Sequence, residues 1–295
     1  QDMRLIRGMG LNALNSESIR SFRQRMKLYR PGHMWERLDD EAFLQKIGAV
    51  GESGGSLHPT SAGLLMFGNR QDILHTYPDY AMTYREQLDA EGHWADTAWS
   101  GNAYEFYYWA YNKLQQDVKT PFKLENGRRV DDTPIRQALR EVLANCLVNA
   151  DYHGCGGIVV SKDHQEITLS NPGSFRVPLD TAKNGGVSDR MFRLVDVGEY
   201  TGGGIPNLYR VWKAEGWPEP VFTESVSPAR VSLTLHMTSH SSRGKTTTGG
   251  KQVPLGALSQ RQLLIDHLTD HPTSDLFALS KALGVSLSRT ESLLQ

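Results

Sequence analysis

The sequence predicts an α+β fold in which an α/β sandwich follows a helical region and precedes a small helical module. Three observations lead to this prediction. Residues 134–152 repeat apolar side chains with the period of a helix. Residues 157–162, 165–171 and 229–237 alternate as strands do. After residue 237 the composition changes to a polar stretch with no hydrophobic period, and a chain of 295 residues is long enough for two domains or more.

Composition gives no global electrostatic argument for nucleic-acid or membrane binding. The chain is 39% hydrophobic and 22% charged with a formal net charge of -1, so any polyanion must bind locally. The two cysteines, Cys146 and Cys155, indicate neither a disulfide framework nor a zinc site of usual spacing. No apolar run approaches the ~18 residues that span a bilayer, and the N-terminus has no signal-peptide pattern. We therefore expect a cytoplasmic protein with no membrane partner.

Short amphipathic helices are predicted in the first third of the chain. Residues 15–30, 38–50 and 58–70 each place apolar side chains at helical spacing. The glycine-rich stretch 51–55 is expected to close the second of these helices, and residues 80–86 alternate like a strand.

Residues 101–118 predict an aromatic-rich helix. Its tyrosines fall on one broad face: Tyr104, Tyr107, Tyr108 and Tyr111. Packing explains such a stripe better than a stacking platform for a ligand, because large aromatic side chains dominate cores. We therefore expect this face to be structural.

Residues 134–152 form the strongest predicted helix, with Thr133 as its N-cap and Pro134 in its first turn. A second stripe borders the apolar one and carries Glu141, Asn145 and Asn149 at four-residue intervals. This stripe is either a solvated edge of a buried helix or one wall of a nucleotide pocket.

The strands 157–162 and 165–171 are separated by a short polar turn and predict a hairpin. Pro172 and Gly173 end it, because proline cannot continue a ladder and glycine permits a left-handed turn. Residues 201–216 are a glycine run that opens a helix.

This ordered set of elements has the logic of nucleotide binding. Glu141 lies one helical turn before Asn145. In this arrangement the glutamate can orient an attacking water, while the asparagine oxygen holds a magnesium ion that bridges phosphates. A turn at Gly173 lets the backbone approach a planar base. Glycines at a helix N-terminus expose N–H donors toward phosphate, which applies to Gly202, Gly203 and Gly204.

The sequence resembles a bacterial family from about residue 4 to residue 240. The stretches that carry the resemblance are "RLIRGMGLNA", "HPTSAGLLMFG", "ALREVLANCLVNADYHG", "ITLSNPGSF" and "GEYTGGGIPNLYRVWKAEGWPEPVF". They are similar to transcriptional regulators, often described as RecG-related ATP-dependent DNA helicases, that join a Schlafen/AlbA-like domain to a GHKL-type (gyrase, Hsp90, histidine kinase) ATPase-like domain. The resemblance implies a GHKL-type α/β sandwich, with ATP and magnesium as cofactors.

The resemblance also implies roles for individual residues. Glu141 falls where the water-activating carboxylate belongs, Asn145 where the magnesium ligand belongs, and Asn149 continues the pocket wall. "NPG" resembles a motif, normally Asp-x-Gly-x-Gly, whose aspartate accepts from the adenine amino group. Asn171 replaces that aspartate and Phe175 replaces the second glycine, while Gly173 is retained. Gly202, Gly203 and Gly204 resemble the phosphate-side glycine box, after a shortened lid.

Plainer interpretations remain open for the same residues. Glu141 and Asn145 can lie on a solvated helix edge, and the glycine run can serve capping and close packing alone. Asp151, His153 and Cys155 suggest a metal cluster, but three mixed loop ligands without a fourth are a weak signal. The stretch "SHSSRGKT", 239–246, lacks the first glycine of a phosphate loop, and we interpret it as linker.

The last residues resemble the first part of a winged helix-turn-helix. In that geometry Ser288, Arg289 and Ser292 face a major groove, and Arg289 contacts phosphate or guanine. A helical protein-interaction or dimerisation module is the alternative. The expected domains are 1–77, the tail of an AlbA-like domain with a helical connector; 78–238, the GHKL ATPase-like domain; 239–253, a linker; and 254–295, the partial winged helix.

Three functions follow from this organisation. The first is a transcriptional regulator that binds DNA through its C-terminal module and carries a divergent ATP-binding domain. The second is an active ATP hydrolase or helicase-related enzyme with Glu141 as general base. The third is a scaffold or homo-oligomerisation protein in which every glycine and asparagine is structural. The expected partners are therefore DNA and a nucleotide, with a second copy of the chain as a further candidate.

Overall fold

The computed structural model describes residues 3–89, 91–116, 124–125, 128–129, 133–175 and 204–237. The chain divides into two units, residues 1–242 and 243–295, and all of the described residues belong to the first. The division falls within the stretch predicted to be a linker. Residues 254–295, with the predicted DNA-binding residues Ser288, Arg289 and Ser292, lie outside the described part of the chain.

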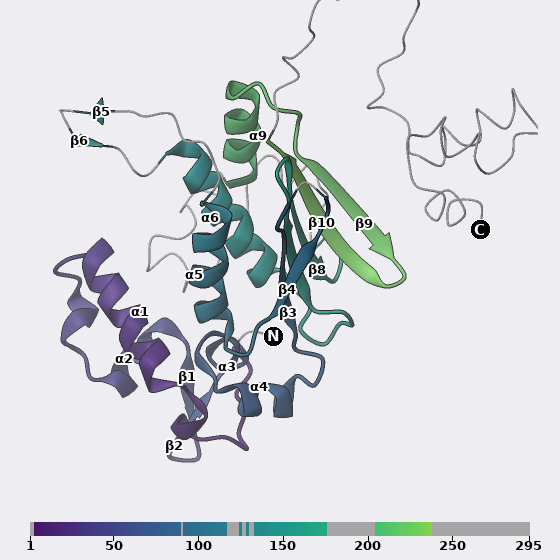
Figure 1. The fold of residues 1–295 in the computed structure, drawn as a ribbon. Coiled ribbons are helices and arrows are strands. Elements are labelled where there is room, and N and C mark those ends of the chain that lie inside the picture. The colour runs from purple at the N-terminus through teal and green to yellow at the C-terminus, as the bar shows by residue number, and fades with distance from the viewer. Residues whose placement is uncertain are drawn as a thin grey trace, which may run out of the picture. The chain divides into compact units, whose positions relative to one another are not determined.

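The fold is α+β, as the sequence predicts (Figure 1). The described helices are η1 (Leu11–Ala13), α1 (Ser16–Tyr29), η2 (Met34–Arg37), α2 (Asp40–Ile47), α3 (Ser61–Phe67), α4 (Arg70–Thr76), α5 (Ala103–Leu114), α6 (Pro134–Val148) and α9 (Gly204–Ala214). The described strands are β1 (Val50–Ser53), β2 (Ser56–Pro59), β3 (Met82–Gln87), β4 (Trp94–Ala98), β5 (Leu124–Glu125), β6 (Arg128–Arg129), β7 (Ile158–Lys162), β8 (Glu166–Pro172), β9 (Val221–Val226) and β10 (Ala229–His236).

Six strands form the main sheet in the order β4-β3-β7-β8-β10-β9. Strands β3 and β7 are parallel, and the other neighbours are antiparallel. The predicted hairpin is confirmed, because β7 and β8 pair with Lys162 opposite Ile167. The strand predicted at residues 80–86 is β3, whereas its partner β4 was not predicted.

The helices α5, α6 and α9 cover one face of this sheet (Figure 1). Alternation directs one set of strand side chains toward them, and these are almost fully buried: Ile158, Val160, Ile167, Leu169 and Leu235. The tyrosine stripe of α5 packs into the same core, with Tyr104 and Tyr107 at 2% and 0% exposure. The structural interpretation of that stripe is therefore confirmed.

The N-terminal helices pack through aromatic side chains. The ring of Phe22 in α1 packs edge to face on that of Phe67 in α3, with 5.2 Å between ring centroids. The ring centroid of Phe43 in α2 lies 6.1 Å from that of Phe22. Asn15 is the N-cap of α1, since its side chain accepts from the backbone N–H groups of Glu17 and Ser18. Hydrophobic side chains of this region join the same continuous core as those of the sheet.

One helix boundary in this region was predicted wrongly. Residues 51–55 were expected to close the second helix, but α2 ends at Ile47, and its C-cap Gly48 has a left-handed φ of 81°. Gly51 lies within β1. Gly54 and Gly55, with φ of 61° and 78°, form the turn between β1 and β2.

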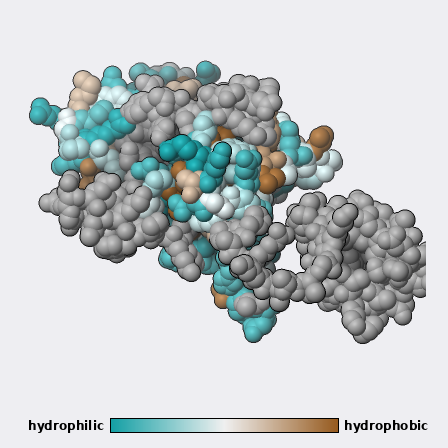
Figure 2. All heavy atoms as spheres, turned by 90° about the horizontal axis from the view of Figure 1, so that it is seen from above, coloured by the Kyte–Doolittle hydropathy of each residue, from teal (hydrophilic) through white to brown (hydrophobic). Residues whose placement is uncertain are grey.

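The surface of the described residues is mixed. In Figure 2 the coloured atoms are largely hydrophilic, with hydrophobic side chains in separate small areas. The most exposed large hydrophobic side chains belong to different elements: Leu28 in α1, Met34 in η2 and Val226 in β9. Among the described helices, none has the length and apolar character needed to cross a membrane.

Candidate nucleotide site

The first residue of the polar stripe of α6, Glu141, faces the interior of the domain. Glu141 is buried with 9% exposure, and Asn145 and Asn149 are half-buried. The amide nitrogen of Asn145 donates to Glu141 Oε1 at 3.4 Å, and the amide nitrogen of Asn149 donates to the Asn145 carbonyl at 3.0 Å. The stripe is a connected row of polar groups, and Glu141 does not lie on a solvated edge.

Helix α9 approaches this stripe at Gly204. A Cβ atom on Gly204 would lie 2.2 Å from Cγ and 2.3 Å from Oε1 of Glu141, so the Glu141 side chain would have to move to admit it. The absence of a side chain at residue 204 therefore allows α6 and α9 to meet. The Glu141 carboxylate lies at the first residue of α9, where the helix dipole favours negative charge. Gly202 and Gly203 lie outside the described residues.

The end of β8 supplies the second part of the site. Asn171 is 7% exposed and shares the helix-covered face with Leu169, since the two residues are separated by one position in the strand. Its amide nitrogen donates to the Pro172 carbonyl at 3.1 Å. Gly173 has a φ of 112°, so the predicted left-handed turn is confirmed.

The C-terminal end of α6 contacts this turn. The Asp151 N–H donates to the Pro172 carbonyl at 2.9 Å. A Cβ atom on Gly173 would lie 3.4 Å from Asp151 Cβ and 3.9 Å from the Asn149 carbonyl oxygen. The structure therefore brings Gly204 to one end of the stripe and Gly173 to the other.

The same contact explains why α6 is shorter than predicted. The helix was expected to run to Tyr152 but ends at Val148. The Asp151 N–H bonds to Pro172 of β8, and the Tyr152 hydroxyl donates to the Leu147 carbonyl at 2.9 Å. These two bonds replace the continuation of the helix.

Phe175 lies over β9. Its ring meets Phe222 at 5.9 Å with an interplanar angle of 62°, and its N–H donates to Glu224 Oε1 at 3.0 Å. Strand β9 is separated from β8 by β10. The aromatic partner of Phe175 is thus two strands away from Asn171.

Burial raises the pKa of two titratable side chains next to the stripe. Burial raises the pKa of the Cys146 thiol from 9.0 to about 12, although Arg230 opposes the shift. Burial is also the main cause that raises the pKa of the Tyr107 hydroxyl above 10.0. Both groups are neutral at physiological pH, so they contribute packing rather than charge.

Lys162 has a role that the sequence did not suggest. Its side chain is 3% exposed, and Nζ donates to the Lys113 carbonyl in the last turn of α5 at 3.1 Å. The sequence pattern could have indicated this role, because the alternation of β7 places Lys162 on the same face as the buried residues Ile158 and Val160. The ammonium group stabilises the C-terminal end of a helix that packs beside α6.

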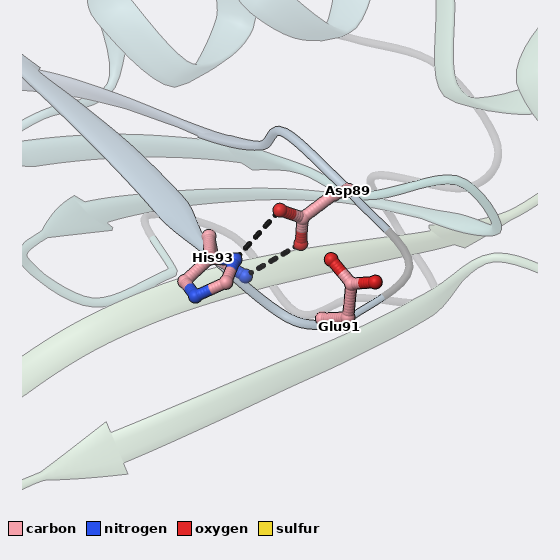
Figure 3. Close-up of side chains that lie close together, drawn as sticks. All are labelled: Asp89, Glu91 and His93. Carbon is pink, nitrogen blue, oxygen red and sulfur yellow. Dashed lines mark hydrogen bonds and ion pairs between the residues drawn. The ribbon is translucent and has the colours of Figure 1, made fainter.

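Three residues in the loop between β3 and β4 form a candidate metal group (Figure 3). Potential ligand atoms of Asp89, Glu91 and His93 lie within 4.8 Å of one another. Asp89 accepts from the His93 N–H at 3.0 Å and pairs with His93 Nδ1 at 2.6 Å, and these bonds lower the pKa of Asp89. The bonds within the loop account for the arrangement without an ion.

The suggested cluster of Asp151, His153 and Cys155 is not formed. Within the described part of the chain these three side chains do not gather as metal ligands. The His153 ring packs on Tyr77 at 4.9 Å, and Cys155 is an exposed free thiol.

Comparisons with known proteins bear on the fold. The family described as a domain of unknown function, DUF8451, matches residues 1–83. No curated protein matches the chain. The structure is similar to that of the DIP2311 protein of Corynebacterium diphtheriae, with 17% identity and a TM-score of 0.60 over 99% of this chain and 59% of that chain. The chain therefore spans less than two thirds of that protein, and at this identity the similarity concerns the fold alone.

Proposed function

We propose that this chain is a DNA-binding transcriptional regulator whose α/β domain, residues 78–238, binds ATP with magnesium. The nucleotide would lie along the polar stripe of α6, with its phosphates toward Gly204 and its base toward Gly173. The DNA-binding part of the proposal rests on the sequence of residues 254–295.

The contact between Glu141 and Gly204 is the observation that carries the nucleotide proposal. The two residues belong to motifs more than 60 positions apart, and the absence of a side chain at Gly204 lets the Glu141 carboxylate lie against the first residue of α9. Their approach brings the predicted catalytic helix to the helix N-terminus that is expected to receive phosphate. Burying Glu141 costs free energy, which is a reason to seek a functional role for it.

The donor set is suitable for magnesium. Mg²⁺ prefers oxygen ligands, keeps several waters and takes only one or two ligands from the protein beside the phosphates of a nucleotide. The Asn145 amide donates through its nitrogen to Glu141, so its oxygen remains the acceptor that would hold the ion. When bound, the ion would neutralise charge on the phosphates.

ATP hydrolysis with Glu141 as general base is the alternative. A carboxylate held by Asn145 can orient a water molecule, which supports this function. Asn171 and Phe175 count against this alternative, because an uncharged amide replaces the carboxylate that the family uses to hold the base and a phenylalanine replaces the second glycine of the motif. A scaffold or homo-oligomerisation protein would bind neither nucleotide nor DNA.

Calorimetric titration of the full chain with a non-hydrolysable ATP analogue tests the proposal. We expect binding that depends on magnesium and weakens at least tenfold in Asn145→Ala, since the variant lacks the ligand oxygen. Asn112→Ala is a matched control, because Asn112 is an exposed asparagine of α5 away from the stripe. Absence of binding in the wild-type chain, or equal affinity in Asn145→Ala, would contradict the proposal.

A further inference from the structure

An exposed carboxylate lies next to the turn where the base is proposed to bind. Asp151 follows the end of α6, and its side chain is exposed. Its N–H bonds to the Pro172 carbonyl at 2.9 Å, and its Cβ would be 3.4 Å from a Cβ on Gly173. Asp151 Oδ1 accepts from the His153 N–H at 3.0 Å. The carboxylate is therefore fixed in position beside Gly173.

Two aromatic contacts hold the Asp151 loop against the domain. The Tyr152 ring stacks on Tyr80 at 5.9 Å with an interplanar angle of 22°, and the His153 ring packs on Tyr77 at 4.9 Å. Tyr77 and Tyr80 are buried, with 4% and 3% exposure. A loop anchored in this way presents its carboxylate with little entropy left to lose on binding a ligand.

Asn171 cannot supply the charge that Asp151 carries. It is buried and neutral, and its amide nitrogen is bonded to Pro172. A hydrogen bond to a charged acceptor is roughly twice as strong as one between neutral groups. Of these two residues, Asp151 is therefore the one that offers a charged acceptor beside Gly173.

We propose that Asp151 determines base specificity by accepting a hydrogen bond from the exocyclic amino group of the bound nucleotide. This inference rests on the proposed nucleotide-binding function and assigns its selectivity to a residue outside the strand motif. A carboxylate attracts an amino group and repels a carbonyl oxygen at the same position. The site then favours adenine, with its 6-amino group, over hypoxanthine, with its 6-oxo group.

Titration of the full chain with ATP and with ITP, both with magnesium, tests this assignment. We expect the wild-type chain to prefer ATP by about tenfold, the factor that corresponds to one charge-assisted hydrogen bond over a neutral one. Asp151→Asn keeps the side-chain acceptor for the His153 N–H but removes the charge, so it should bind the two nucleotides with nearly equal affinity.

Asp163→Asn is the matched control. Asp163 also accepts backbone N–H groups, from Gln165 and Glu166, but it lies in the turn between β7 and β8, at the other end of β8 from Gly173. This variant should keep the wild-type preference for ATP.

The outcomes separate this inference from the function on which it rests. If both nucleotides bind and Asp151→Asn keeps the wild-type ratio, the assignment of Asp151 is overturned while nucleotide binding stands. If neither nucleotide binds the wild-type chain, the proposed function fails and the inference fails with it.

Discussion

Glu141 is a buried carboxylate with neighbours on two helices. Asn145 donates to it from one turn further along α6, and the first residue of α9 lies against it. The interval between Glu141 and Asn145 was visible in the sequence, because residues four apart share a helix face. Their burial was not visible, since the same pattern occurs on solvated edges. The structure shows that Glu141 is buried against the first residue of α9, so it does not lie on a solvated edge.

Cys146 and Cys155 should react differently with thiol reagents. Cys146 is buried, with a pKa raised to about 12, whereas Cys155 is exposed. At pH 8 we expect Ellman's reagent to modify one thiol of the native chain and both thiols in urea, because the thiolate is the nucleophile. The variant Cys155→Ser should show no rapid reaction. Rapid modification of both thiols in the native chain would contradict the described burial.

The same shift has a consequence for stability. The unfolded chain ionises this thiol above its ordinary pKa of 9.0, whereas the folded chain keeps the proton up to about 12. The folded state therefore binds more protons between these values, and Cys146 lowers the free energy of unfolding as the pH rises from 9 to 12.

At the scale of elements, the close approach of α6 and α9 has a steric requirement at one position. Gly204→Ala should lower the free energy of unfolding by about 1–3 kcal/mol, the usual cost of overpacking. In the double variant with Glu141→Ala most of that cost should disappear, because the clash is with the Glu141 side chain. Urea denaturation of the single and double variants measures this coupling.

Gly216→Ala is the control for that cycle. Gly216 has a φ of 70° and no atom within 4 Å of an added Cβ, so alanine is strained there by backbone conformation alone. Its cost should be unchanged by Glu141→Ala. Equal costs of Gly204→Ala with and without Glu141 would contradict the contact between α6 and α9.

The hydrophobic period of the sequence predicted the types of these helices and strands well, but it did not predict where they end. The helix α6, the β7–β8 hairpin and the strands β3 and β10 lie where the sequence predicts them. The C-terminal end of α6 depends on a bond from Asp151 to Pro172, which joins residues distant in sequence and is therefore invisible to local patterns. Strand β4 has mostly exposed side chains, so it lacks the alternation that reveals a half-buried strand.

The candidate site was partly predictable for a related reason. Glu141, Asn145, Asn171 and Gly173 stand out by residue type and spacing. Asp151 was considered as a metal ligand, and its place beside Gly173 depends on how a loop folds back onto β8.

At the scale of the molecule, the α+β fold class agrees with the one that the sequence predicts. We propose that residues 254–295 bind DNA, so DNA binding should be separable from nucleotide binding. We expect the full chain to be retained on duplex DNA in a salt-dependent manner, because phosphate contacts release counterions. Deleting residues 254–295 should abolish retention and leave nucleotide affinity unchanged.

Substitution of Arg289 refines that experiment. Arg289→Ala should weaken retention and reduce its salt dependence, while Arg210→Ala, which removes an exposed arginine of α9, should not. Retention that survives the deletion would place DNA binding elsewhere in the chain, and no retention by the full chain would favour a scaffold.

The position of a bound nucleotide tests the account most directly. A crystal structure of the full chain with magnesium and a non-hydrolysable ATP analogue should show the phosphates between Asn145 and the N-terminus of α9, with the base at Gly173. A nucleotide bound away from α6 would contradict the account. So would a structure at saturating ligand in which no nucleotide contacts Glu141, Asn145 or Asn149.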